Sequence, residues 1–142
     1  MTTASNVILV PVDFEAASTK ALATAKDLAA RFGVEVVLVH VYQLPVYTYP
    51  GLEPTLLPGF HTEVTAAAQR ALNDLAQKEN ARGVLREGDP STEILAAAEE
   101  LGAAMIVMGT HGRTGLSHLF LGSVAEKVVR KSQVPVLTVR VA

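Results

Sequence analysis

The sequence predicts an α/β domain built on a doubly wound, Rossmann-like sheet of five parallel strands. Two observations support this fold class. Short apolar segments rich in Val, Ile and Leu alternate with longer segments of helical periodicity, in the order βαβαβαβαβ. The first segment, 7–12, is apolar at every position, which is typical of a strand covered on both faces. Right-handed crossovers between such strands place helices on both faces of the sheet.

The predicted strands lie at residues 7–12, 34–41, 83–87, 104–108 and 134–141. The helices between them are predicted from apolar side chains that recur three or four positions apart. These side chains are Ala21, Ala25, Leu28 and Phe32; Val64, Ala68, Leu72 and Leu75; Ile94, Leu95, Ala98 and Leu101; and Val124, Val128 and Val129. Gly33 and Gly102 are C-terminal stop signals, and Asp89 followed by Pro90 is a typical helix opening.

Composition excludes several classes of protein. The 142 residues are 49% hydrophobic with a mean hydropathy of +0.30, which predicts one globular domain over 1–142. A net charge of -2 with interspersed acids and bases gives no nucleic-acid footprint. The chain has no cysteine, so disulfides and thiolate metal sites are excluded. No apolar run approaches the roughly 20 residues of a membrane span, so we expect a cytoplasmic protein without membrane contact.

Glycines at positions 109, 112, 115 and 122 separate the fourth strand from the fourth helix. Backbone without Cβ atoms can approach a phosphate closely, and the first turn of a following helix adds free N–H groups. Arg113 adds a positive charge, and the Ser123 hydroxyl can cap the helix or contact a phosphate. The alternative is that the glycines only shape a strand-to-helix crossover. No lysine precedes Ser123, which excludes a P-loop, and the glycines follow the wrong strand for a dinucleotide fingerprint.

Ligands of doubly wound sheets bind beyond the carboxyl ends of the strands, where the winding reverses. At these ends lie Pro11, Val12 and Asp13 after the first strand, and His40 and Val41 at the second. Asp13 can accept hydrogen bonds from ribose, with an apolar slot for a base near Val12 and Val41. Two alternatives remain open, because Asp13 can instead be a helix N-cap and Val41 an ordinary core residue. His40 is interpreted as a core histidine with a satisfied partner.

These residues resemble the universal stress protein family. The resemblance runs through segments 7–13, 39–41, 87–90, 108–113 and 134–139. Its most specific part is Gly109-x2-Gly112-x9-Gly122-Ser123, which matches the pattern of the family's ATP-binding branch at every position. One departure is Glu15, because the family often has a serine soon after the aspartate.

The resemblance implies a strand order of 3-2-1-4-5, with ATP, alone or with magnesium, bound between the first and fourth strands. It implies that Asp13 contacts ribose, that the Val41 backbone contacts adenine, and that the glycine stretch contacts ribose or phosphates. It also implies a homodimer in which the last strands, 134–141, pair antiparallel. The candidate nucleotide-binding residues are Pro11, Val12, Asp13, Val41, Gly109, Thr110, Gly112, Arg113, Gly122, Ser123 and Val124.

Three functions remain open from the sequence. The first is an ATP-binding stress or signalling protein without strong catalysis, whose assembly responds to nucleotide. The second is a weak ATPase or phosphotransferase, although only the phosphate cradle and Arg113 can be named for that chemistry. The third is an interaction module that binds AMP, cyclic AMP or no nucleotide. His111 and His118 lack partners at metal-ligand spacing, so the sequence does not identify a metal site. No catalytic residue is predicted.

Two further features bear on function. A receiver domain shares this order of elements, but it needs an acidic pair after the first strand and a lysine after the last, where this chain has Asp13-Phe14 and Arg140. The connection 43–60 holds four of the seven prolines and is longer than usual for a compact domain. It is interpreted as a lid over the nucleotide or, alternatively, as a surface loop.

Overall fold

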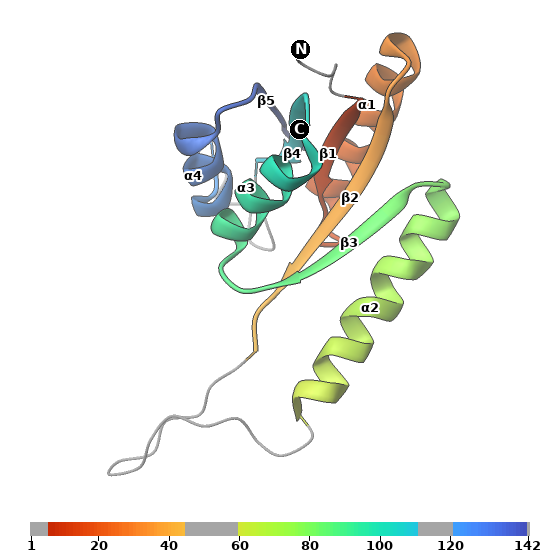
Figure 1. The fold of residues 1–142 in the computed structure, drawn as a ribbon, viewed down its shortest axis with the longest axis vertical. Helices are drawn as coiled ribbons and strands as arrows, with labels where there is room; N and C mark the ends of the chain where they lie inside the picture. The colour runs from red at the N-terminus through yellow and green to blue at the C-terminus, as the bar shows by residue number, and fades with distance from the viewer. Residues whose placement is uncertain (1–5, 45–59, 111–120, 142) are drawn as a thin grey trace.

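The structure, a computed structural model, describes residues 6–44, 60–110 and 121–141 (Figure 1). These residues confirm the predicted fold class. The strands are β1 (Val7–Pro11), β2 (Glu35–Tyr42), β3 (Arg82–Glu87), β4 (Met105–Gly109) and β5 (Val136–Val139). The helices are α1 (Ala16–Phe32), α2 (Phe60–Glu79), α3 (Pro90–Leu101) and α4 (Ser123–Lys131). Every pairing is parallel, and the strand order is β3-β2-β1-β4-β5.

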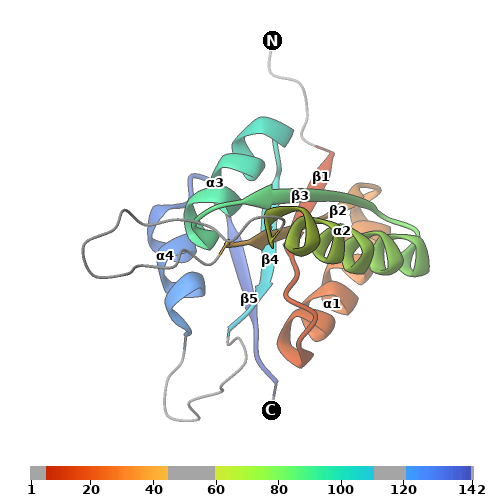
Figure 2. The same ribbon diagram turned by 90° about the horizontal axis from the view of Figure 1, so that it is seen from below.

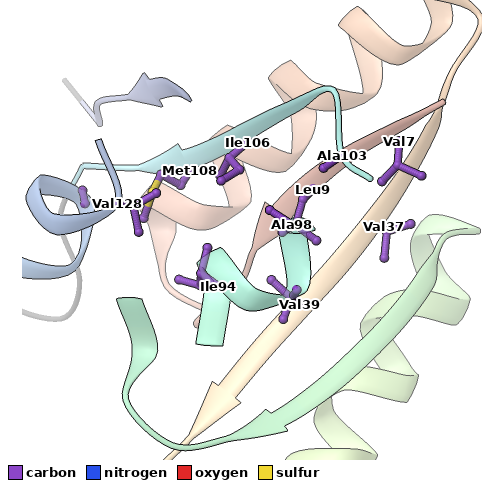
Figure 3. Packing of buried hydrophobic residues seen from close by; sticks show 12 residues of the cluster. Val7, Leu9, Val37, Val39, Ile94, Ala98, Ala103, Ile106, Met108 and Val128 are labelled. Carbon is purple, nitrogen blue, oxygen red and sulfur yellow. The ribbon is translucent and has the colours of Figure 1, made fainter. Parts of the chain in front are cut away.

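The sheet is covered on both faces, with α3 and α4 on one side and α1 and α2 on the other (Figure 2). Successive side chains of a strand point to opposite faces, so each central strand supplies both layers of the core. Leu9 lies in the α3/α4 layer (Figure 3), whereas its neighbour Val10 lies in the α1/α2 layer. The same alternation places Ile106 and Val107 of β4 in opposite layers. These four side chains are fully buried, which explains the uninterrupted apolar runs.

Local signals at the helix ends act as predicted. Gly33 and Gly102 follow α1 and α3 in the left-handed conformation, with φ of 68° and 60°, which glycine adopts without a steric penalty. Asp89 is the N-cap of α3, and its carboxylate accepts a hydrogen bond of 3.1 Å from the Thr92 N–H. Pro90 occupies the first helical position.

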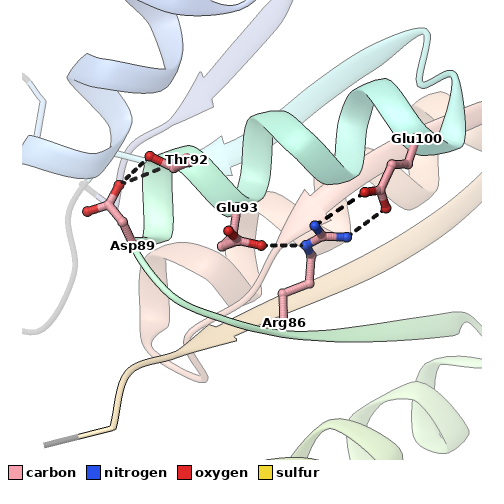
Figure 4. A network of polar contacts seen from close by, with 5 residues as sticks. All are labelled: Arg86, Asp89, Thr92, Glu93 and Glu100. Carbon is pink, nitrogen blue, oxygen red and sulfur yellow. Dashed lines mark hydrogen bonds and ion pairs between the residues drawn. The ribbon is translucent and has the colours of Figure 1, made fainter.

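An ion-pair network fastens the edge strand β3 to α3 (Figure 4). Arg86 of β3 donates from Nε to Glu93 at 2.8 Å and from Nη1 to Glu100 at 2.7 Å. These hydrogen bonds, first that to Glu100 and then that to Glu93, raise the pKa of the guanidinium. The edge strand is therefore held by side chains as well as by its ladder with β2.

The prediction that Phe32 and Val129 belong to the core is wrong, because both side chains are exposed. Phe32 is 67% exposed because α1 ends there, so its side chain extends past the buried part of the helix. Val129 is 43% exposed, because one step along a helix from the buried Val128 turns the side chain by about 100° and away from the sheet. Val128 itself is fully buried, and the remaining predicted stripe of α4 packs as expected.

The last strand is also shorter than the predicted 134–141. β5 begins at Val136, because Ser132 forms a local turn in which its hydroxyl donates to the Val134 carbonyl and accepts from the Val134 N–H. The following Pro135 has no N–H to donate, although its carbonyl accepts from Ile106 N–H. The second helix, α2, begins at Phe60, the last residue of the predicted connection 43–60. Residues 45–59, which were interpreted as a lid or a surface loop, lie outside the described residues.

The Asp89 cap gives the fold a defined acid sensitivity. Hydrogen bonds from the Thr92 N–H, then from the Ser91 and Thr92 hydroxyls, lower the pKa of Asp89 below its ordinary value of 3.8. A carboxyl with a lowered folded-state pKa stabilises the fold above its ordinary pKa, and this contribution is lost as the pH falls through the folded-state value. We expect Asp89→Ala to lower the Tm at pH 7 and the Tm difference from the parent to shrink below pH 3.8, measured by circular dichroism.

The matched control is Asp74→Ala on the exposed surface of α2, where no hydrogen bond holds the carboxylate among the described residues. We expect this variant to melt like the parent at every pH tested. A Tm difference for Asp89→Ala that persisted unchanged into strong acid would contradict the role of its carboxylate.

Candidate functional site

The winding of the sheet reverses at β1, which pairs with β2 on one side and with β4 on the other. The chain therefore leaves β1 and β4 at the same edge of the sheet, toward helices on opposite faces. Ligands of parallel α/β sheets bind at such an edge, outside the carboxyl ends of the strands. The structure thus brings the turn after β1 and the start of the glycine stretch to one place.

The turn after β1 presents Asp13 to solvent. Asp13 is not the N-cap of α1, because the helix begins at Ala16 and Glu15 holds the cap position. Its Oδ1 instead accepts a hydrogen bond of 2.9 Å from the Glu15 N–H. Among the described residues, Oδ2 has no hydrogen-bond partner. Asp13 therefore keeps an exposed carboxylate oxygen for a ligand while the other oxygen shapes the turn.

A buried serine supports this turn from below. The Ser18 hydroxyl accepts from the Asp13 N–H at 3.3 Å and donates to the Glu15 carbonyl at 3.2 Å. Glu15 stands where the family often has a serine, and Ser18 is not among the residues that the sequence pattern predicted for the site. Its position in the first turn of a helix was the available signal, because hydroxyls there often bond to nearby backbone.

Phe14 and His40 fix the other side of the turn. Phe14 has φ of 66°, an uncommon left-handed conformation for an aromatic residue, and its ring lies 4.7 Å from that of His40. His40 Nδ1 lies 2.8 Å from the Val12 carbonyl oxygen. Since a carbonyl only accepts, Nδ1 carries the proton. His40 is thus a satisfied, half-buried histidine, as the sequence analysis interpreted it.

The structure does not form an apolar slot from the side chains of Val12 and Val41. Val12 is buried in the α1/α2 layer, and Val41 packs against the α3/α4 layer on the opposite face. Strand alternation forces this separation. Pro11 is half-buried and pairs with Val39. A base bound at this edge of the sheet would therefore contact the backbone of Pro11, Val12 and Val41, and not a shared pocket of their side chains.

Gly109 is required by packing. A Cβ at this position would lie 2.7 Å from Ala17 Cβ and 2.8 Å from the Ala17 carbonyl carbon. Ordinary carbon contacts are about 3.5–4.0 Å, so any side chain would push α1 away from β4. The bare backbone predicted for phosphate approach is, at Gly109, explained by the close approach of α1.

The two ends of the glycine stretch are fastened to each other. Thr110 donates its N–H to the Val139 carbonyl at 3.0 Å, and its own carbonyl accepts from the Gly122 N–H. Gly122 is the N-cap of α4, without any side-chain cap, so Ser123 is the first helical residue and not the predicted cap. The predicted ligand residues Gly112 and Arg113 lie outside the described residues.

Ser123 and Val124 begin α4 and supply the first of its N–H groups. The first intrahelical bond runs from the Glu126 N–H to the Gly122 carbonyl at 2.9 Å, so the preceding N–H groups of the helix have no partner within the helix. Ser123 is exposed and Val124 half-buried. An uncapped helix start beside the end of β4 is suited to bind an anion.

The described residues hold neither a cluster of metal ligands nor a membrane-spanning helix. Within 6–44, 60–110 and 121–141, no group of three or more His, Cys, Asp or Glu side chains could hold a metal ion. None of the described helices has the length and apolar character needed to cross a membrane.

The fold and this edge define a Rossmann-like α/β protein in which a helix without a side-chain cap starts beside the end of the fourth strand. Residues 5–140 match the sequence profile of the universal stress protein family. The chain belongs to that family.

Individual relatives agree with this assignment. Universal stress protein YxiE of Bacillus subtilis is 35% identical, over 95% of this chain and 99% of its own length. Universal stress protein MJ0577 of Methanocaldococcus jannaschii is 32% identical, over 94% of this chain and 93% of its own. The solved structure of MJ0577 superposes with a TM-score of 0.66 at 27% identity, covering 97% of each chain. A universal stress protein in complex with cAMP has the same fold, with a TM-score of 0.66 at 24% identity over 99% of this chain and 100% of that one.

The Gly109 contact is testable by a double-mutant cycle. Gly109→Ala should destabilise the protein by about 1–3 kcal/mol, because the added methyl group overpacks against α1. Removing the opposing methyl group with Ala17→Gly should recover part of this loss, although the Ala17 backbone still limits the space. Urea unfolding of the parent, the two single variants and the double variant measures the coupling.

Ala17→Gly alone serves as the control for the helix propensity that the double variant also loses. Strictly additive effects of the two substitutions would refute the contact between Gly109 and Ala17.

Proposed function

We propose that this protein binds ATP and acts as a nucleotide-responsive stress or signalling protein without strong catalysis. The observation that supports this most directly is the uncapped start of α4, held beside the end of β4 by the bond from Gly122 N–H to the Thr110 carbonyl. It coincides with the Gly109-x2-Gly112-x9-Gly122-Ser123 pattern, which resembles the ATP-binding branch of the family.

In this proposal the two halves of the nucleotide contact different elements. The free oxygen of Asp13 accepts from the ribose hydroxyls, and the first N–H groups of α4 with the Ser123 hydroxyl bind phosphate oxygens. Backbone of Pro11, Val12 and Val41 lines the base. Gly109 contributes its backbone, and Gly112 and Arg113 remain predictions from the sequence.

Magnesium, if it accompanies ATP, would be held mainly by the phosphates, as this ion commonly is in nucleotide sites. A role as a binding protein is proposed because the sequence offers only the phosphate cradle and Arg113 for phosphoryl transfer. A cytoplasmic location also stays a prediction from the composition.

We further propose a homodimer through the last strand. β5 pairs with β4 on one side only among the described residues, which leaves the other edge of a parallel sheet open. Leu137 of β5 is 38% exposed, and Val141, two residues after the end of the strand, is 49% exposed. Native proteins normally cover or charge such strands, because open edges recruit other chains. Antiparallel pairing with a second copy would cover it.

Nucleotide binding can be measured without knowing the biological signal. The purified protein is denatured, and released nucleotide is identified by mass spectrometry; emptied protein is then titrated with ATP and magnesium, AMP and cyclic AMP. We expect ATP binding, weakened about tenfold by Asp13→Asn, which keeps an oxygen for the Glu15 N–H but replaces an acceptor by a donor.

Asp74→Asn makes the same chemical change on the exposed surface of α2 and should leave binding unchanged. Tighter binding of AMP or cyclic AMP than of ATP would replace the proposed ligand. An emptied protein that binds none of the three, by calorimetry or by thermal shift, would refute a nucleotide function.

The dimer is tested by light scattering after size exclusion. The parent should have twice the molar mass of one chain. Leu137→Lys should reduce this mass to that of a single chain, because burying a charged side chain where two strands pair is costly. Val129→Lys places the same charge on the exposed face of α4 and is the control. A monomeric parent, or a dimer that survives Leu137→Lys, would argue against this edge.

A further inference from the structure

The hydrogen-bond ladder between β1 and β2 stops one bond short at the carboxyl edge of the sheet. Pro11 pairs with Val39, and the Val12 N–H continues the ladder by donating to the Val39 carbonyl at 2.8 Å. In a regular parallel ladder the next bond would run from the Val41 N–H back to the Val12 carbonyl. Among the described residues, no backbone N–H donates to that carbonyl.

The side chain of His40 occupies the Val12 carbonyl instead. Its Nδ1 lies 2.8 Å from the Val12 oxygen and carries the proton that is donated. A ring nitrogen thus replaces a backbone donor, and the Val41 N–H is left without a partner in the part of the chain that the structure describes. Backbone groups at the end of a ladder are normally paired, so this replacement calls for a physical reason.

Phe14 leaves the Val41 carbonyl open as well. If β1 continued as a strand, the Phe14 N–H would be the next donor to that carbonyl. Phe14 instead has φ of 66°, which takes the chain out of strand geometry. A bulky residue in this conformation is strained, and such strain is found mainly where a ligand or a switch requires it. The Phe14 ring also lies 4.7 Å from the His40 ring, so the two residues hold each other in place.

Both open groups of Val41 point toward the end of β1. The Tyr42 carbonyl accepts from the Gly88 N–H, which shows that Tyr42 directs its backbone groups toward β3. In a parallel strand the N–H and carbonyl of one residue point to the same side, and successive residues alternate. Val41 therefore presents a donor and an acceptor side by side, at the edge where Asp13 is exposed.

We propose that His40 is a positioning residue, which keeps the last bond between β1 and β2 open so that the backbone of Val41 can bind a ligand. This inference rests on the proposed nucleotide function and assigns a role to a side chain outside the candidate binding residues. A heterocyclic base that carries an acceptor beside a donor on its rim fits the open N–H and carbonyl. Without the ring donor, the Val41 N–H would bond to the Val12 carbonyl, and the ligand would lose that contact.

The first test measures the open bond in the ligand-free protein. Leucine and asparagine have nearly the same shape, but only asparagine carries an N–H close to the position of Nδ1. Hydrogen exchange of the Val41 amide, followed by NMR, should be fast in the parent and in His40→Asn. It should be about tenfold slower or more in His40→Leu, because the bond to Val12 closes.

The Val12 amide is the control, because it already bonds to Val39 and should exchange slowly in all three proteins. Loss of structure would speed the exchange of both amides, so slower exchange at Val41 separates the proposed role from simple destabilisation. If His40→Leu does not fold, His40→Phe keeps a ring against Phe14 without the donor and should slow the same amide.

The second test measures binding by calorimetry. His40→Leu should weaken binding of ATP with magnesium about tenfold, while His40→Asn stays close to the parent. Inorganic tripolyphosphate, which has no base, should bind the three proteins equally.

A Val41 amide that exchanges slowly in the parent, or equally fast in all the variants, would overturn this inference. Equal ATP affinity of His40→Leu and His40→Asn, in a parent that binds ATP, would also overturn it and leave the proposed function standing. Equal losses for ATP and tripolyphosphate in His40→Leu would do the same. A parent that binds no nucleotide would overturn both.

Discussion

The central strand β1 is the constraint on which the rest of the structure depends. It is paired on both edges and buried on both faces, so its apolar side chains must supply two core layers at once. Parallel strands are joined by crossover connections, so a helix follows the end of β1. Because both faces of β1 are apolar, helices must cover both sides of the sheet. The reversal of winding beside β1 then places the end of β4 next to Asp13, which is the geometry of the candidate site.

Much of this arrangement was predictable, because it depends on local signals. The alternation of apolar segments predicted the sheet, and Gly33 and Asp89 marked helix ends through their own backbone preferences. The failures came at the ends of elements, where the apolar pattern runs on past the last residue that packs or pairs. Phe32 has helical spacing that suits the core, but the buried part of α1 ends before it. β5 is short because the Ser132 turn and Pro135 delay its ladder.

The site was predicted in outline and less well in detail. The sequence located the edge and its residues, but it could not show that Gly109 faces Ala17 across the α1–β4 contact, since the two residues are far apart in the chain. One glycine pattern can therefore combine packing needs with ligand needs. Similarly, residue type alone left Asp13 open between N-cap and ligand residue. The structure shows a turn that uses one carboxylate oxygen and exposes the other.

The parallel sheet has an electrostatic consequence. All five strands run in one direction, so each of α1 to α4 starts near their carboxyl ends. Each helix start carries about half a positive elementary charge from its aligned peptide dipoles. The four helix starts therefore add partial positive charge at this end of the sheet, opposite in sign to the acidic side chains that lie there, such as Asp13, Glu15 and Asp89. Partial charges of this kind attract small anions whatever side chains surround them, and dissolved salt weakens the attraction.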